Sequence, residues 1–236
     1  MPLVDLNIDL GETPGEPAAL YALATVVNIA AGGHAGDKAS MARAVSFAMT
    51  RGAKVAAHPS YPDRAGFGRV VIDLDPAAIA ATVEEQCAAL QGIARRLGYP
   101  AGIVKPHGAL YHEAAKSAAV ARALIEGALA GLGVEDMVVV GPPRGALLDE
   151  ALRRGLRYAR EGFADRAYRA DGSLVPRSER GALVVDAGAC ARQAVALAAT
   201  GTIETICVHG DTEGAVAIAS GVRDALLGNG YLAGAI

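Results

Sequence analysis

Histidines and acidic residues recur in this chain directly after short apolar runs. All five histidines lie at or just beyond the end of such a run, in motifs that each contain glycine or proline: Asp5–Glu12, Asn28–Asp37, Ala57–Asp63, Val104–His112, Glu161–Arg166 and Val208–Asp211. In parallel α/β proteins, the carboxyl ends of the strands collect the catalytic groups. The pattern therefore favours an enzyme whose active site lies at one rim of such a fold.

Asp9 and Glu12 form a carboxylate pair after the first apolar run. Two carboxylates that share a site can bind a metal or divide the acid and base roles, because each shifts the pKa of the other. Asn7 and Asp9 are polar at alternate positions, so they lie on one face of a strand. The structural alternative is that Asp9 only ends a strand while Glu12 is solvated. We expect both to be functional.

His34 and His58 follow the second and third apolar runs. The glycines around His34 allow a ligand to approach the backbone closely, and Asp37 is suited to cap the helix that follows. Pro59 fixes the chain just after His58 and gives this imidazole a rigid support. We expect both histidines to act as ligands or as acid–base groups.

Lys105 and His107 flank a proline after the fourth apolar run, and His209 ends the last one. A lysine is costly to bury without an anionic partner, so Lys105 is expected to face a carboxylate or the substrate. His209 is expected to be functional, although the neighbouring Asp211 would also suit a helix cap. His112 is expected to be structural or peripheral.

Two further roles are open on residue types alone. Asp9, His34 and His58 could bind a divalent metal, because two imidazoles and a carboxylate suit an open zinc or manganese site. Arg166 could clamp a carboxylate, with an exposed salt bridge as the alternative. The sequence contains no Walker phosphate-binding loop, no H-E-x-x-H motif and no G-x-S-x-G nucleophile elbow.

Seven strands separated by helical segments would position these residues. The expected strands are 3–9, 25–30, 53–57, 102–105, 136–141, 156–161 and 204–208, and the clearest helices are 38–51, 76–97, 114–131, 188–199 and 212–228. This alternation predicts a single α/β domain over residues 1–236, with a parallel sheet and right-handed crossovers. Periodicity does not decide whether the sheet closes. The polar stretch 162–180 is interpreted as a functional loop, with an ordinary surface loop as the alternative.

Composition excludes several classes of function. The net charge is -3, tryptophan is absent and aromatic residues make up 4%, so nucleic-acid binding has no support. The cysteines Cys87, Cys190 and Cys207 are too dispersed to suggest a disulfide framework. The N-terminus lacks the basic start of a signal peptide, and no apolar run reaches membrane-spanning length. A cytoplasmic protein without membrane contact is expected.

The motifs, taken together with Gly66–Arg69, closely resemble the LamB/YcsF family of 5-oxoprolinase A subunits, in order and over nearly the whole chain. The resemblance implies a distorted seven-stranded parallel β/α barrel, similar to a TIM barrel. It also implies ATP-dependent opening of 5-oxoproline to L-glutamate, with ATP as co-substrate and with two partners, the B and C subunits.

The residues fit such a reaction. Asp9 or Glu12 is the candidate base, and four histidines are candidates for proton transfer or for stabilising an oxyanion: His34, His58, His107 and His209. Lys105 is also a catalytic candidate. The residues expected to contact the substrate are Asn28, Lys105, Asp165, Arg166 and Asp211.

Three positions depart from the family pattern: Ala31, Gly33 and Lys38 stand where Cys, Phe and Pro are expected. His34 and Asp37 are present, so the site is expected to be intact, with consequences for pocket shape and loop stiffness. Two alternative functions remain open. One is a metal-dependent, deacetylase-like amidohydrolase acting on a small or carbohydrate amide, and the other is a non-catalytic subunit that binds a small molecule.

Overall fold

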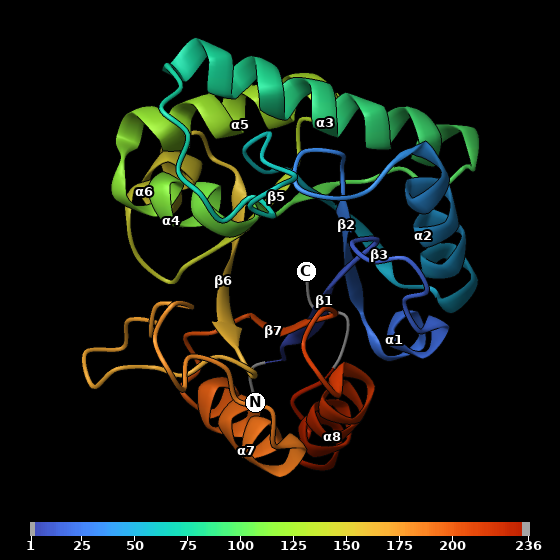
Figure 1. The fold of residues 1–236 in the computed structure, drawn as a ribbon, viewed down its shortest axis with the longest axis vertical. Helices are drawn as coiled ribbons and strands as arrows, with labels where there is room; N and C mark the ends of the chain where they lie inside the picture. Colours follow the sequence, from blue (N-terminus) through green and yellow to red (C-terminus); the bar gives the residue numbers. More distant parts are fainter. Residues whose placement is uncertain (1–2, 233–236) are drawn as a thin grey trace.

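Seven parallel strands close into a barrel in the computed structural model, which describes residues 3–232 (Figure 1). The strands are β1 Asp5–Leu10, β2 Val26–Ala30, β3 Lys54–His58, β4 Ile103–Val104, β5 Val138–Gly141, β6 Arg157–Phe163 and β7 Thr205–His209. Each strand pairs with the next along the chain, and β7 closes onto β1 in a register that runs from Asp5–Thr205 to Asp9–His209. The expected seven-stranded parallel barrel is confirmed.

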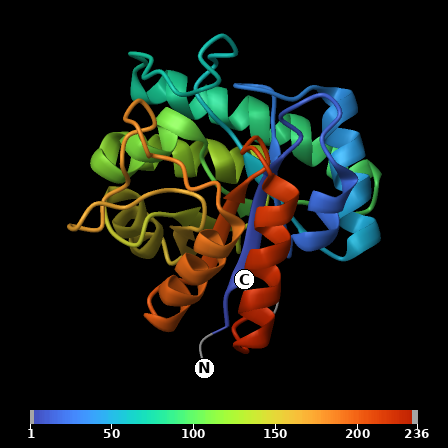
Figure 2. The ribbon, with the colours of Figure 1, turned by 60° about the horizontal axis from the view of Figure 1, so that its bottom comes forward.

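Helices surround the barrel and connect its strands (Figures 1 and 2). They are α1 Ala18–Leu23, α2 Lys38–Arg51, α3 Pro76–Arg96, α4 Gly108–Lys116, α5 Ala118–Leu132, α6 Ala146–Arg153, α7 Ala187–Ala199 and α8 Ala215–Gly228. The long helices α3 and α5 pack side by side, as do α7 and α8. Gly127 of α5 allows the close packing of α5 on α3, because a Cβ at this position would lie 2.3 Å from the carbonyl oxygen of Ala80.

The expected elements agree with the structure except between residues 108 and 132. The prediction of a single helix over 114–131 is wrong, because the helix is interrupted at Ser117. Ser117 has extended backbone angles and its hydroxyl accepts a hydrogen bond from Val120 N, which ends α4 and begins α5. The short helices α1 and α6 are not among the expected elements, because 6 and 8 residues show too little of a helical period.

Aspartates begin α2 and α3, as their sequence positions suggest. The Asp37 carboxylate accepts a hydrogen bond from Ser40 N, and the Asp75 carboxylate accepts one from Ala78 N, just before Pro76. Lys38 is therefore the exposed first residue of α2. Proline is well tolerated at this helical position, so the departure at Lys38 is a surface change that leaves the helix start intact.

The barrel interior has an apolar part and a polar part. Alternate positions of neighbouring strands place Val26, Ala56, Ile103, Val138, Val140 and Ala159 in one apolar cluster. Asp9 and Asn28 are in register with Ala56 and continue that interior row as polar side chains. The larger apolar core lies between the strands and the surrounding helices. Polar groups inside the barrel are thus shielded on all sides except at the rim.

No helix within residues 3–232 is both long enough and apolar enough to cross a lipid bilayer.

Candidate active site

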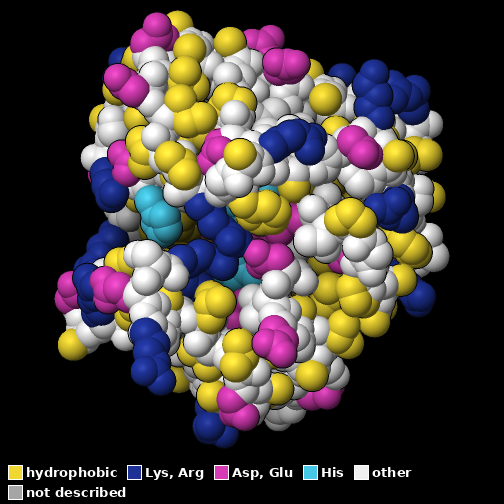
Figure 3. Space-filling view, in the orientation of Figure 1, with side chains coloured by type: hydrophobic (Ala, Val, Ile, Leu, Met, Phe, Trp, Pro, Cys, Tyr) yellow, Lys and Arg dark blue, Asp and Glu magenta, His cyan; other side chains and the backbone are white. Residues whose placement is uncertain are grey.

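A pocket of about 530 Å³ opens at the rim formed by the carboxyl ends of the strands, and Figure 3 shows the hollow with histidine and basic side chains around it. The expected site residues that line it are Asp9, His58, Lys105, His107, Arg166 and His209. Glu12 and His34 line a neighbouring pocket of about 550 Å³. Asn28, Asp165 and Asp211 line neither pocket. The structure therefore brings most of the expected residues together, on two sides of one cluster.

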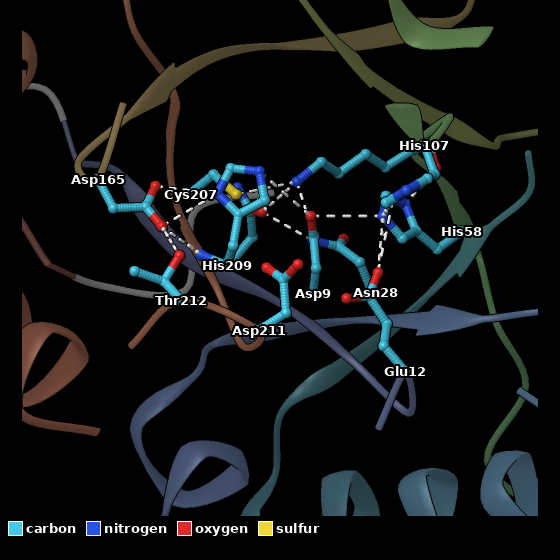
Figure 4. A network of polar contacts seen from close by, with 12 residues as sticks. Asp9, Glu12, Asn28, His58, His107, Asp165, Cys207, His209, Asp211 and Thr212 are labelled. Atoms are coloured by element: carbon cyan, nitrogen blue, oxygen red, sulfur yellow. Dashed lines mark hydrogen bonds and ion pairs between the residues drawn. The ribbon is translucent and has the colours of Figure 1, made fainter. Parts of the chain in front are cut away.

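Asp9, which is labelled in Figure 4, and Lys105 form the buried centre of the site. Lys105 Nζ lies 2.7 Å from Asp9 Oδ1 and 2.8 Å from Glu161 Oε1, and Asn28 Nδ2 donates to Asp9 Oδ1 at 2.7 Å. Burial alone would raise the pKa of Asp9, but the Lys105 ammonium and the neighbouring His58 hold it well below its ordinary value. Asp9 is therefore ionised, and Lys105 does face carboxylates, as expected.

The surroundings of Lys105 bear on its role. Its ammonium also donates to Asn7 Oδ1 at 3.0 Å and to Cys207 Sγ at 3.1 Å, so its three N–H donors are matched by Asp9, Asn7 and Cys207, while Glu161 adds an ion pair. Lys105 thus holds Asp9 in place and has no donor left for a substrate carboxylate. Asn28 likewise supports Asp9 from within the barrel.

His209 is fixed by a buried carboxylate. Its Nδ1 lies 2.9 Å from Asp165 Oδ1, and Asp165 also accepts hydrogen bonds from His209 N and from the Thr212 hydroxyl. Because an ionised carboxylate only accepts, Nδ1 carries the proton and Nε2 is left with a lone pair. Nε2 lies 3.9 Å from Asp9 Oδ2, and the Phe163 ring stacks on the imidazole.

Asp165 lies behind His209, outside the pocket, although it was expected to contact substrate. Burial would raise the pKa of Asp165, but its electrostatic and hydrogen-bond interactions with His209 lower it overall, so the carboxyl is ionised. Asp211 instead pairs with Arg69 on the surface beside the rim. These two residues orient other side chains in this structure.

His34, His58 and His107 form a compact cluster with Glu12. His34 Nε2 is 3.0 Å from Glu12 Oε1, and the His34 and His107 rings stack with centroids 3.7 Å apart. Burial lowers the pKa of both His34 and His107, which favours their neutral forms. Burial, followed by the Asp9 charge, raises the pKa of Glu12.

Phe67 is a site residue that the sequence did not single out. It has a φ of 55°, in the left-handed region, and its carbonyl accepts a hydrogen bond from His107 Nε2 at 3.0 Å. Its ring lies against His34, and the Arg69 guanidinium stacks over it. The glycines at 66 and 68 were a signal of unusual backbone here. Glu161 and Thr212 were also missed as site residues, although Glu161 begins one of the expected motifs and Thr212 directly follows another.

Arg166 holds the loop 162–180 at the rim through hydrogen bonds. It is buried rather than exposed, and its guanidinium donates to the carbonyl oxygens of Ala182 and Val175. Burial and the charge of Arg177 lower its pKa to about 10. Segment 174–178 of the same loop forms a wall of the pocket that contains His209.

The departure at Gly33 has a local packing reason. Gln86 is fixed by two hydrogen bonds, accepting from Ser60 N and donating to Ser60 O. A Cβ at Gly33 would lie 2.4 Å from both the Ser60 hydroxyl and Gln86 Oε1. A phenylalanine at this position would therefore require both side chains to move.

We expect Gly33→Ala to lower the free energy of unfolding by about 1–3 kcal/mol, as is typical of overpacking a well-filled site. Urea unfolding measures this change. Gly102→Ala is the matched control, because a Cβ at Gly102 would meet nothing within 4 Å, and it should be neutral or slightly stabilising. Equal stability of the two variants would contradict the packing argument.

Sequence comparisons match nearly the whole chain. The model of the LamB/YcsF family matches residues 4–234. A protein from Mycobacterium marinum, named as the A subunit of 5-oxoprolinase, is 42% identical over 98% of this chain and 97% of its own length. A protein of the same name from Nocardia farcinica is 45% identical, over 98% of each chain.

Structure comparisons agree with the sequence matches. The lactam utilization protein from Thermus thermophilus superposes with a TM-score of 0.90 at 33% identity, over 99% of this chain and 100% of its own. A family 4 carbohydrate esterase from Streptomyces lividans has a TM-score of 0.51 at 15% identity, over 97% of this chain and 90% of its own. At that identity, the second match shows a common fold alone.

Proposed function

The chain belongs to the LamB/YcsF family, and from this premise we propose that it is the A subunit of a 5-oxoprolinase. The reaction would open the lactam of 5-oxoproline to L-glutamate, coupled to the hydrolysis of ATP. The observation that carries the proposal is the match, over almost the full length of both chains, to proteins named as 5-oxoprolinase A subunits. The carbohydrate esterase shares the fold only, so it gives the deacetylase alternative no further weight.

His209 is the residue best placed to act as general base. Its Nε2 has a lone pair in the pocket, and the buried Asp165 carboxylate would stabilise the imidazolium formed when Nε2 takes a proton from water. The hydroxide equivalent adds to the lactam carbon, the ring C–N bond breaks, and the same proton can pass to the leaving nitrogen. Asp9, the carboxylate candidate, is a weaker base because Lys105 lowers its pKa.

Arg166 is the candidate for binding the substrate carboxylate. It lines the same pocket as His209. A guanidinium has five N–H donors, so the two that bind the loop carbonyls do not exhaust it. With Lys105 fully engaged inside the barrel, Arg166 is the better candidate of the two.

ATP would act on the lactam oxygen. An amide carbonyl is a poor electrophile, and transfer of the γ-phosphoryl group to its oxygen, with ADP as the leaving group, makes the ring carbon easier for water to attack. Attack by one water and cleavage of the ring C–N bond then give an acyl phosphate of glutamate, and a second water hydrolyses it to glutamate and inorganic phosphate. The chain has no Walker loop, so we place the groups that bind and transfer the phosphoryl in the B and C subunits. The loop 162–180 is our candidate contact with them, since its charged residues lie beside the pocket.

The purified chain should therefore release no glutamate from 5-oxoproline and ATP until the B and C subunits are added. Glutamate release and ADP formation, measured with each combination of subunits, check this expectation. Omitting ATP from the full mixture is the matched control and should abolish glutamate release. Rapid ATP-dependent release of glutamate by the chain alone would contradict the proposal that the B and C subunits bind ATP and transfer its phosphoryl group.

A further inference from the structure

Two imidazoles in the site direct lone pairs at one another. His58 Nδ1 lies 2.7 Å from the carbonyl oxygen of Lys105, and His107 Nε2 lies 3.0 Å from that of Phe67. A carbonyl oxygen only accepts, so both of these nitrogens carry protons. The remaining atoms, His58 Nε2 and His107 Nδ1, are 3.0 Å apart. If both rings are neutral, no proton lies between them.

Carboxylate oxygens face the same point. Glu12 Oε1 lies 3.5 Å from His107 Nδ1 and 3.9 Å from His58 Nε2, and it is 3.0 Å from His34 Nε2. Asp9 Oδ2 lies 3.4 Å from His58 Nε2. Acceptor atoms thus converge from several elements into a small buried volume (Figure 4). Such a set is stabilised by a cation.

The hydrogen bonds behind these rings match those of metal-binding histidines. Such a histidine donates its other ring N–H to a backbone carbonyl or a carboxylate, which fixes the tautomer and the ring orientation. His58 and His107 both do so. His34 is held differently, since its Nδ1 is buried and has no hydrogen-bond partner in the described structure. We therefore expect His34 to be the weakest ligand of the group.

We propose that Glu12, His34, His58 and His107 bind one divalent transition-metal ion, with one ligand atom from each residue, all within 4.8 Å of one another. Imidazole nitrogens with a carboxylate oxygen suit zinc, manganese or cobalt. This set keeps His34 and His58 from the sequence analysis and replaces Asp9 with Glu12 and His107. Asp9 is already paired with Lys105, so its charge is largely compensated.

A second group, Asp9, Cys207 and His209, has similar spacing but a different charge environment. The Lys105 ammonium lies 2.7 Å from Asp9 Oδ1 and 3.1 Å from Cys207 Sγ. A fixed cation there repels a metal ion and already serves the same acceptors. The Glu12 group has no such ammonium among its hydrogen-bond partners within residues 3–232, so it is the one we assign to the metal.

The proposed ion would lie between the two pockets, because His58 and His107 line the one that contains His209, and Glu12 and His34 line the other. Either pocket gives a path for the ion and for small ligands. The proposal rests on the arrangement of donor atoms and needs no particular substrate. Failure of the lactam reaction would therefore leave it standing, and failure to bind metal would leave the lactam reaction open.

Metal uptake by the whole chain tests the proposal. After chelator treatment, the chain is titrated with Co²⁺ alone and with Zn²⁺ alone, and elemental analysis gives the stoichiometry. We expect one ion per chain and a visible Co²⁺ spectrum of nitrogen and oxygen ligation. His58→Ala and His107→Ala should each weaken binding by on the order of a hundredfold, and His34→Ala by about tenfold.

The controls are His112→Ala, which changes an exposed histidine outside the cluster, and His209→Ala, which removes a member of the second group. Both should bind Co²⁺ as the unaltered chain does, and circular dichroism should show every variant folded. If a ligand variant does not fold, the metal stoichiometry and the Co²⁺ spectrum of the unaltered chain still test whether the metal site exists. No uptake by the folded chain would overturn the proposal, and would indicate instead an imidazolium between His58 and His107. Loss of binding in His209→Ala alone would also overturn it.

Discussion

His209→Ala should lower the turnover of the assembled enzyme by at least about a hundredfold, as is typical when a positioned proton-transfer group is lost. The imidazole is held by the buried Asp165 carboxylate and stacks on Phe163, so its Nε2 points into the pocket in one defined orientation. Among the histidines that line this pocket in the described structure, only His209 has one ring nitrogen hydrogen-bonded to a carboxylate while the other ring nitrogen makes no hydrogen bond. Steady-state glutamate release by the complex with the proposed B and C subunits measures the effect.

Asp9→Asn belongs in the same series and should show a loss of similar size. Asparagine keeps the shape but removes the charge that faces the histidine cluster and His209. His112→Ala is the matched control: the side chain lies at the edge of the same pocket but is exposed, and turnover should change little. Circular dichroism and the thermal midpoint should show that each variant is folded and assembles.

This series also distinguishes a catalytic subunit from one that only binds a small molecule. A binding subunit would show changes in KM with turnover near normal, whereas a lost base lowers kcat. Near-normal turnover of His209→Ala or of Asp9→Asn in the complex would show that the catalytic role of that residue is wrong. It would also favour catalytic groups in the partner subunits.

The sequence was enough to predict which residues gather at the rim. Apolar runs with turn residues fix the strands to within two residues, and the rule that strand ends meet at one edge then places His58, Lys105 and His209 together. The closure of the barrel came from the family resemblance, because apolar periodicity is the same in open and closed parallel sheets. The register between neighbouring strands is known only from the structure.

The roles within the site could not be predicted in the same way, because they depend on contacts across space. Asp165 and His209 are 44 residues apart, and nothing in their motifs indicates that the carboxylate lies behind the imidazole. The protons on His58 and His107 are fixed by backbone carbonyls, one of which belongs to Phe67 in an unusual conformation. Residue types show which side chains are present, while backbone carbonyls such as that of Phe67 determine which ring nitrogens of the histidines keep a lone pair.

Lys105→Met should be the most destabilising single change in the site, lowering the free energy of unfolding by about 3–5 kcal/mol, the usual cost of removing one partner of a buried ion pair. The lysine side chain is 2% exposed and its ammonium lies between the carboxylates of Asp9 and Glu161. Without it, two acidic groups inside the barrel would face one another with no compensating charge. Urea unfolding, followed by circular dichroism, measures the loss.

The double variant Lys105→Met with Glu161→Gln tests the electrostatic cause. Methionine fills a volume close to that of the lysine stem, so the single variant changes charge more than packing. If the loss comes from uncompensated carboxylates, neutralising Glu161 should recover part of it, and Glu161→Gln alone should cost less than Lys105→Met, because Lys105 then still has Asp9 and Asn7 as acceptors. Single and double variants of equal stability would show that the loss comes from packing. A loss below about 1 kcal/mol in Lys105→Met would mean that water reaches the barrel centre and solvates both carboxylates.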